Sequence, residues 1–241
     1  MAVDLDGIDG YVKCGDVLGF DYNIPFSVSL WINIDNDNSD QKLITKRLAI
    51  SPYTGWEIAI DGTGSNAWVR FSITQTWSTK VIDVRTDWLL VVGNYYHIVC
   101  TYDGSNDVSG QHIYVNADDK SLITVHNKAM DGSIANVAEL CIGARNKTVQ
   151  FYDGRESEVA IWDVELSQTD VSLLYQARLK RMPFQIKKSN LVFYLPLDDV
   201  VDGISIDGQT FKDLSGNNYD GTGSDSGGQS VGKAESLLSY P

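Results

Sequence analysis

Basic residues are scarce in this 241-residue chain, which has 19 Lys and Arg against 32 Asp and Glu and a formal net charge of −13. The negative field of such a protein repels a phosphate backbone, so we expect no nucleic-acid partner, and it repels an anionic membrane surface in the same way. No apolar run reaches the length of a transmembrane helix, so we expect no membrane insertion. An acidic surface suits high solubility, cationic partners or calcium.

Cysteine is also rare, and the three residues Cys14, Cys100 and Cys141 cannot all pair within one chain. No C-x-x-C metal spacing occurs, so we expect small buried thiols and a domain that no disulfide holds together. The first residues have neither a basic nor an apolar signal region, so no secretory signal is expected. The location stays unknown at this point, with an extracellular or a virion surface under consideration.

Short strand patterns dominate what is present. Apolar and polar residues alternate in several segments, which indicates strands with one face on a core. The residues expected to face the core are Phe26, Val28, Leu30, Ile32, Ile34, Trp56, Ile58, Ile60, Val69, Phe71 and Ile73. Trp68, Arg70 and Ser72 are then expected to face outward. Clusters of Asp, Gly, Asn and Ser separate the segments, so the sequence predicts an all-β sandwich or barrel.

One segment, 167–181, has helical spacing instead, because its apolar residues recur every three or four positions. Ser167 is a suitable N-cap and Asp170 completes an acidic variant of the capping box. Pro183 follows, and its ring and missing N–H end a helix. The sequence therefore predicts one short helix near 167–181.

A set of motifs occurs in a fixed order between residues 6 and 171. They are Asp6–Val12, Phe26–Trp31, Tyr95–Gly104 with its partner strand His112–Asn116, and a close formed by Ile142–Gly143, Tyr152–Trp162 and Leu166–Val171. Together they resemble the laminin-G-like jelly-roll domains of the concanavalin A-like lectin/glucanase superfamily. The resemblance implies a two-sheet antiparallel jelly-roll β-sandwich, and it says less about function because such folds host unrelated activities. Glu156 and Ser157 depart from the pattern, which has an apolar residue and an aspartate there.

The end of the chain contains motifs of the same family in an unusual position. The runs 191–198 and 213–222 resemble the opening that normally precedes such a domain, but here they follow it. We therefore divide the chain into a laminin-G-like sandwich, 1–188, and a C-terminal strand with a Gly/Ser-rich, loop-like tail, 189–241. The tail either folds back on the same sandwich or docks on a neighbouring copy. Folding back is favoured, because an apolar strand with an open edge invites aggregation.

Calcium is the candidate cofactor that the resemblance implies, since members of the family often hold one ion at an edge of the sandwich. Calcium takes several hard oxygen ligands. The candidate ligands at or beside acidic positions of the family motifs are Asp6, Asp9, Asp153 and Glu158. Ser157 removes one carboxylate that the family pattern has, and ordinary turn aspartates are the alternative interpretation.

Exposed aromatic rings are the candidates for sugar binding, because sugar C–H groups stack on the negative face of a ring. The candidate residues are Tyr53, Trp56, Trp68, Trp77 and Trp88. Trp68 lies on the outward phase of its strand and the others flank loops. We expect most of them to pack in the interior and one or two to be exposed.

The predicted function is a non-catalytic module that binds glycan or protein surfaces with the aid of calcium. The alternative is a surface or decoration protein of a phage or viral particle, which would self-associate or bind capsid proteins. The missing signal, the odd cysteine count and the displaced strand motivate that alternative. A glycoside-active enzyme is least favoured, because no E-x-D-x-x-E-like run occurs. The closest pairs are Glu156 with Glu158, which alternation would put on one face, and Glu57 with Asp61.

Overall fold

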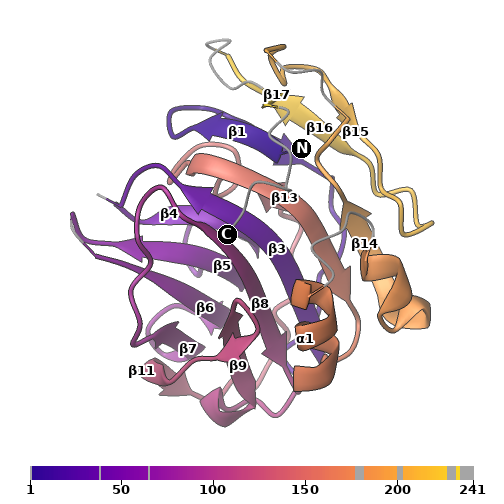
Figure 1. Cartoon of the computed structure of the whole chain (residues 1–241). Coiled ribbons are helices and arrows are strands. Elements are labelled where there is room, and N and C mark those ends of the chain that lie inside the picture. Colours follow the sequence, from indigo (N-terminus) through magenta and orange to yellow (C-terminus); the bar gives the residue numbers. More distant parts are fainter. Residues whose placement is uncertain are drawn as a thin grey trace.

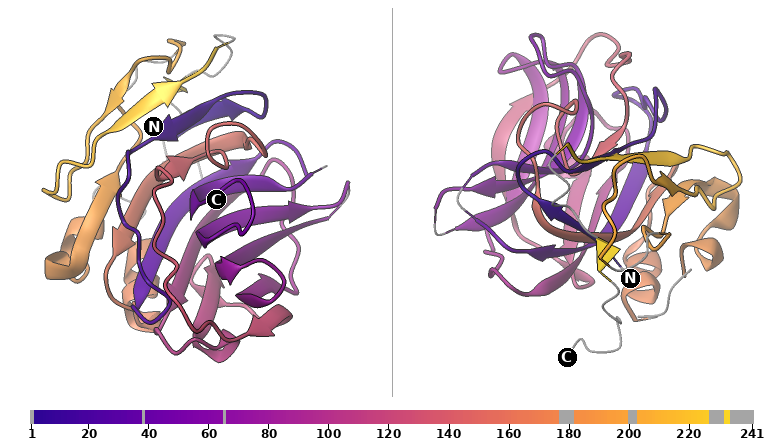
Figure 2. Two further views of the ribbon diagram at one scale, coloured as in Figure 1. Left: turned by 180° about the vertical axis from the view of Figure 1, so that it is seen from behind. Right: turned by 90° about the horizontal axis from the view of Figure 1, so that it is seen from above.

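The computed structural model describes residues 2–37, 39–64, 66–176, 182–199, 203–226 and 232–233. Strands hold 46% of the chain and helices 8%, and the strands form two antiparallel sheets that face each other as a sandwich (Figures 1 and 2). The predicted all-β fold class and the two-sheet, jelly-roll-like architecture are therefore confirmed.

Each sheet mixes strands from distant parts of the chain. The eight-stranded sheet has the order β10 (Asp118–Asp119), β9 (Gln111–Val115), β8 (Tyr95–Tyr102), β3 (Phe26–Ile34), β13 (Asp153–Trp162), β1 (Ala2–Asp6) and β17 (Gly232–Lys233), and β14 (Leu191–Leu195) also pairs with β13. The nine-stranded sheet has the order β11 (Leu122–Lys128), β7 (Lys80–Thr86), β6 (Ala67–Thr76), β5 (Gly55–Gly62), β4 (Gln41–Arg47), β12 (Cys141–Ile142), β2 (Tyr11–Lys13), β16 (Gly221–Ser224) and β15 (Thr210–Phe211).

The α-helix, α1, spans Gln168–Gln176. Its capping box forms as predicted, because the Ser167 N–H donates to Asp170 Oδ2 at 3.0 Å and the Asp170 N–H donates to Ser167 Oγ at 3.3 Å. Residues 177–181, which completed the predicted helix, lie outside the described residues. The described residues also contain three short 3₁₀ helices: η1 (Val108–Gly110), η2 (Met182–Gln185) and η3 (Lys188–Asn190).

The main core lies between the two sheets and follows the predicted alternation. Phe26, Val28, Leu30, Ile32 and Ile34 of β3 are fully buried in it. The predicted inward residues of β5 and β6 join the same cluster. Burial of large apolar side chains at this density is the main stabilising term of the sandwich, since each contributes about 1.5–3 kcal/mol.

A second apolar cluster lies on the outer face of the eight-stranded sheet. Val171 and Leu174 of α1 pack there with Val99 of β8 and with Ala160 and Trp162 of β13. Figure 1 shows α1 beside these strands. Among the described residues, no helix has a corresponding apolar contact with the outer face of the nine-stranded sheet.

The C-terminal segment pairs with strands of its own chain. β13 pairs with β1 through residues 153–156 and then with β14 along 159–162, with Val159 opposite Leu195. β16 adds to β2 in the other sheet. Figure 2 shows this segment packed along the N-terminal strands. The division near residue 188 stays a prediction, but the strands beyond it complete the two sheets.

Strand β16 lies within the glycine-rich tail that the sequence predicts to be loop-like. A Cβ on Gly221 would lie 2.6 Å from Cγ1 of Val12, and one on Gly223 would lie 2.1 Å from the carbonyl oxygen of Ile206. These glycines are therefore needed for the close approach of neighbouring segments, which composition alone does not distinguish from a flexible loop.

The three cysteines are free and buried, as predicted. Burial raises the pKa of Cys100 and Cys141, so the uncharged thiols behave as small apolar side chains.

The packing of β14 can be tested with a pair of leucines. We expect Leu195→Ala to cost about 2–5 kcal/mol of unfolding free energy, because Leu195 is fully buried in the main core. Leu173→Ala, at a position of α1 that is 45% exposed, is the matched control and should cost less than about 0.5 kcal/mol. Urea unfolding measures both. Equal small costs would mean that β14 does not belong to the folded unit.

Candidate functional site

The outer face of the nine-stranded sheet carries charged and aromatic side chains. On β6 the outward positions are Trp68, Arg70 and Ser72, which lie opposite Asp61, Ala59 and Glu57 of β5. This is the outward phase that the alternation in β6 predicts, because the neighbouring positions enter the core. Of these six residues, Trp68, Arg70 and Asp61 are partly exposed, whereas the other three are buried.

Glu57 is the centre of a buried ion cluster on this face. Its carboxylate lies 2.5 Å from Arg47 Nη1, 2.8 Å from Arg145 Nη2 and 3.4 Å from Lys42 Nζ. Burial by itself raises the pKa of Glu57, but the three cations outweigh it and lower the pKa to about 2. The carboxylate is therefore charged at every physiological pH and holds the cationic side chains in place.

A second ion pair lies on the adjacent strand. Arg70 Nε donates to Asp83 Oδ1 at 2.9 Å, and Arg70 Nη2 donates to Asp83 Oδ2 at 2.5 Å. His126 Nδ1 of β11 lies 3.3 Å from the same carboxylate. Trp77 packs against both clusters, since its ring centre lies 4.8 Å from the guanidinium carbon of Arg47 and 5.4 Å from that of Arg70. We call these groups, together with those around Glu57, the outer-face cluster.

Trp68 has a different cation over its ring. The guanidinium carbon of Arg85, on β7, lies 4.1 Å from the centre of the Trp68 ring, within the range of a cation–π contact. Both residues are half-buried, so their remaining surface is open to solvent. The Trp68–Arg85 pair and Trp77 thus place two partly exposed indoles on one sheet face.

Of the other aromatic candidates, Tyr53 lies with the outer-face cluster, whereas Trp56 and Trp88 lie elsewhere. The prediction of Trp56 as a binding residue is wrong, because its side chain is fully buried in the main core and its indole N–H donates to the Leu18 carbonyl. Tyr53 is half-buried and lies beside Arg47. Trp88 is 37% exposed, but it lies in the loop after β7 against Tyr96. The structure therefore brings Trp68 and Trp77 to one face and leaves Trp88 apart.

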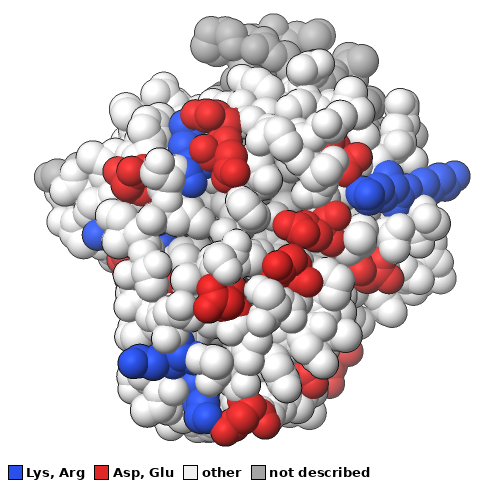
Figure 3. Space-filling model, turned by 90° about the horizontal axis from the view of Figure 1, so that it is seen from below, with Lys and Arg blue, Asp and Glu red and all other residues white. Residues whose placement is uncertain are grey.

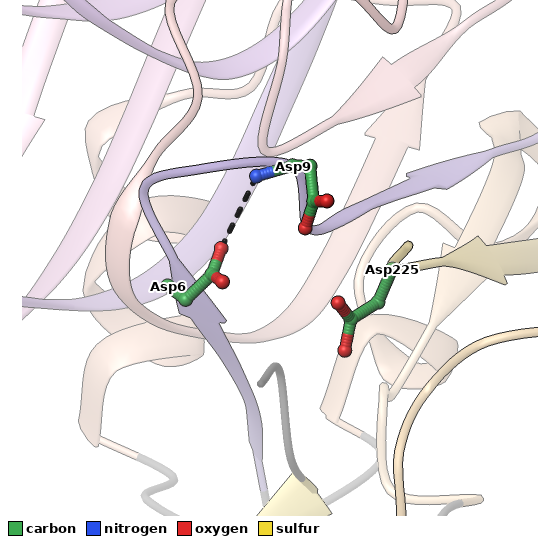
Figure 4. Close-up of side chains that lie close together, drawn as sticks. All are labelled: Asp6, Asp9 and Asp225. Atoms are coloured by element: carbon green, nitrogen blue, oxygen red, sulfur yellow. Dashed lines mark hydrogen bonds between the residues drawn. The ribbon is translucent and has the colours of Figure 1, made fainter. Parts of the chain in front are cut away.

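A group of carboxylates lies at the edge of the sandwich (Figure 4). Asp6 is at the end of β1, Asp9 is in the turn that follows, and Asp225 comes directly after β16. One oxygen from each lies within 4.8 Å of the others. Asp6 Oδ1 accepts the backbone N–H groups of Ile8 at 2.9 Å and Asp9 at 3.3 Å, which shapes the turn. The group thus draws its residues from the ends of strands in both sheets.

The geometry of this acidic group fits a calcium ion. Two oxygens bound to one calcium at about 2.3–2.6 Å can be no more than about 5 Å apart, which the three carboxylates satisfy. Oδ2 of Asp6 and Oδ1 of Asp9 are buried without a hydrogen-bond partner, a costly arrangement that a cation would relieve. Asp6, Asp9 and Asp225 would hold such an ion.

The two remaining calcium candidates are placed differently. Asp153 lies opposite Asp6 on the neighbouring strand but outside the group of three. Its pKa is raised by burial and by the charges of Asp35, Asp6 and Asp4. Glu158 accepts a hydrogen bond from the Tyr194 hydroxyl, away from the group. The structure thus brings together Asp6 and Asp9 but not Glu158.

The paired acids weighed for catalysis are separated by a bulge. Glu156 lies opposite Ile32 and Val3, which belong to the main core, and burial raises its pKa well above the usual range. The register of β13 shifts between Ser157 and Ala160, and Glu158 has a left-handed φ of +54°. Glu158 therefore points to Tyr194, which belongs to the second apolar cluster on the eight-stranded sheet. The two carboxyl groups do not face one site.

Comparison with protein families assigns the chain. A family model described as concanavalin A-like lectin/glucanases superfamily, Laminin_G_3, matches residues 6–172. The chain belongs to this family, which confirms the resemblance seen in the motifs. No curated protein sequence matches the chain. Among the described residues, no helix is long and apolar enough to cross a membrane.

Several solved structures share the fold. A "putative carbohydrate binding protein" of Bacteroides ovatus ATCC 8483 is 19% identical with a TM-score of 0.63, over 93% of this chain and 58% of that one. Domain 4 of AbnA, an extracellular GH43 arabinanase of Geobacillus stearothermophilus solved with arabinotriose, is 21% identical with a TM-score of 0.53, over 73% of this chain and 76% of that domain. The chain thus spans little more than half of the Bacteroides protein.

Some residues of these sites were not predicted from the sequence. Asp225 lies more than two hundred positions from Asp6, and no local spacing connects the two. Arg85 and Asp83 alternate on β7 as Trp68 and Arg70 do on β6, so their outward phase was a usable signal. Their pairing across the strands requires the register, which the sequence does not contain.

The Glu57 cluster predicts a large and pH-dependent effect. We expect Glu57→Gln to cost about 3–5 kcal/mol at pH 7, because it leaves buried cations without their partner. Glu57 has a lowered pKa in the folded state, so its stabilisation is complete above its ordinary pKa of 4.5 and is lost as the pH falls through about 2. In urea unfolding, the difference in unfolding free energy between wild type and variant should therefore shrink as the pH is lowered from about 4.5 to about 2.

Glu139→Gln is the control, since Glu139 pairs with Lys147 and both side chains are about one-third exposed. Exposed pairs contribute about 0–1 kcal/mol. If Glu57→Gln costs no more than this control at pH 7, the cluster does not have the stabilising role assigned to it.

Proposed function

We propose that this chain is a non-catalytic glycan-binding module and that sugars bind on the outer face of the nine-stranded sheet. The observation that carries the proposal is the presence of Trp68 and Trp77, both partly exposed, among fixed charged side chains on this face. Indole rings stack on sugar C–H groups, and charged or amide groups beside them orient hydroxyls. The arabinotriose complex of the AbnA domain supports a sugar as the ligand class.

We further propose that calcium binds Asp6, Asp9 and Asp225. An ion there would tie the β1–β2 turn to the end of β16 and so fasten the C-terminal segment to the sandwich. Its role would be to stabilise the fold that presents the outer face. The extracellular arabinanase with the same fold supports an extracellular location, where calcium is abundant.

A protein surface as the partner is the second candidate. The loop after β7 exposes Trp88, Leu89, Val91 and Val92 within five residues, a concentration of apolar surface typical of protein contacts. The displaced C-terminal strand no longer supports a surface protein of a phage or viral particle, because β14 pairs within its own chain. Loss of glycan binding on substitution of Trp68 would favour the sugar over the protein surface.

Substitution of a single indole tests the glycan site. We expect Trp68→Ala to weaken binding of any oligosaccharide that binds the wild type by about tenfold or more, about 1.4 kcal/mol, because it removes the stacking surface. An array of oligosaccharides that includes arabinotriose identifies ligands, and calorimetry measures affinity. Trp88→Ala, outside the face, is the control and should bind like the wild type. Loss of binding in Trp88→Ala alone would place the site elsewhere.

Calcium binding is tested by thermal unfolding. If the dissociation constant is about 0.1–1 mM, calcium at about 10 mM adds about 1.4–2.7 kcal/mol of stability. We expect the melting temperature to rise by about 3–10 °C. Asp225→Asn should abolish the rise, whereas Asp131→Asn, at an exposed residue paired with Lys80, should retain it. An unchanged melting temperature in the wild type would contradict a calcium site.

A further inference from the structure

The outer face has a charge balance opposite to that of the whole protein. The chain has a formal net charge of −13, and Figure 3 shows acidic side chains spread over the side seen from below, with basic ones among them. Around strands β4 to β7 on the outer face of the nine-stranded sheet, by contrast, the charged groups of the outer-face cluster and its neighbours are five basic and four acidic side chains. The basic residues are Lys42, Arg47, Arg70, Arg85 and Arg145, and the acidic ones are Asp40, Glu57, Asp61 and Asp83.

Four of the five cations have carboxylate partners. Lys42, Arg47 and Arg145 share Glu57, and Arg70 binds both oxygens of Asp83. Burial alone lowers the pKa of Arg70, but the hydrogen bonds and charge of Asp83 outweigh it and raise it. Arg85 is the exception, because none of the described residues forms an ion pair or hydrogen bond with its side chain.

The position of Arg85 places a like charge opposite it, and an anion would relieve this repulsion. Arg85 lies directly opposite Arg70 across β6 and β7. Like charges at such opposed positions destabilise a sheet, and Asp83 neutralises only Arg70. The neighbour of Arg85 on β11 is Ile123, which offers no charge. An anionic group on the ligand would supply the missing partner.

Arg85 is also prepared to bind such a group. The Trp68 ring fixes its guanidinium at 4.1 Å, so little side-chain entropy remains to be lost on binding. A guanidinium has five N–H donors in a plane, and two of them match the two oxygens of a carboxylate or sulfate. The indole at its side would at the same time contact the sugar ring that carries the acidic group.

We propose that the Trp68–Arg85 pair is a specificity site for acidic glycans, whose carboxylate or sulfate group binds Arg85 while the sugar contacts Trp68. This inference rests on the proposed glycan-binding function and adds the ligand class. An acidic ligand accounts for the position of Arg85 beside the Trp68 ring on a protein with a net negative charge. A neutral sugar would need no cation there.

Matched ligands with and without charge test the inference by calorimetry. The probes are trigalacturonate and trimannuronate with their carboxyl-reduced counterparts, and a sulfated galactan tetrasaccharide with its desulfated counterpart. We expect at least one acidic member to bind at least about tenfold more tightly than its neutral counterpart. A gain in the uronate pairs would identify carboxylate as the bound group, and a gain in the galactan pair would identify sulfate. The gain should also fall as sodium chloride is raised, because salt screens exposed charges.

Variants assign the gain to Arg85. Arg85→Gln should bring the acidic ligand to the affinity of its neutral counterpart, and Arg85→Lys should retain part of the gain. Lys212→Gln removes the same charge at an exposed residue paired with Asp220 and should leave the gain intact. Melting temperatures near that of the wild type would show that the variants fold.

The outcomes separate this inference from the proposed function. If neutral sugars bind as tightly as acidic ones and Trp68→Ala weakens both, the acidic specificity is overturned and the glycan site stands. An acidic gain that Arg85→Gln leaves unchanged would also overturn the role of Arg85. If no sugar of either kind binds and the array finds no ligand, the proposed function fails and the inference with it.

Discussion

The two-residue period of the β-strand is the constraint on which the rest of this structure depends. Every strand that places an apolar residue in the core must place the next residue on the opposite face. On β6, the burial of Val69 and Phe71 therefore carries Trp68 and Arg70 outward. The eight-stranded sheet covers its outer face with α1, whereas the nine-stranded sheet carries charges and indoles there.

Electrostatic pairing then determines how these outward side chains lie. Glu57 is nearly inaccessible to water, and its charge is tolerated because three cations surround it. The buried carboxylate of Asp83 pairs with Arg70 in the same way, and His126 Nδ1 lies 3.3 Å from it. Trp77 is packed against these pairs, so its position depends on them. Ion pairs thus hold the candidate site, with most of the charged groups on strands β4 to β7 and with Arg145 and Trp77 in the connections between strands.

The sequence predicted much of the fold because the signals for it are local. The alternation in β3 gave its five inward residues, and the spacing of Ser167 and Asp170 gave the capping box of α1. The phase of Trp56 with Ile58 and Ile60 already indicated burial, so its choice as a sugar-binding candidate was inconsistent with the pattern. The alternation in β6 also gave the outward phase of Trp68, Arg70 and Ser72 on the candidate face.

What the sequence did not predict depends on register and on distant pairing. The bulge at Glu158 reverses the expected phase, so Glu156 enters the core although both acids were expected on one face. The glycines of β16 have a turn-like composition but are required by close packing against Val12 and Ile206. Asp225 meets Asp6 only after β16 has paired with β2. None of these relations is expressed by local periodicity.

The central claim is that the outer face of the nine-stranded sheet binds the sugar. The most direct measurement is a nitrogen-15 spectrum of the tryptophan indole N–H groups, recorded while an oligosaccharide identified on the array is titrated. The account predicts that the signals of Trp68 and Trp77 shift, while those of the buried Trp56 and Trp162 stay in place. Shifts confined to Trp88 or Trp31, with Trp68 and Trp77 unchanged, would contradict it.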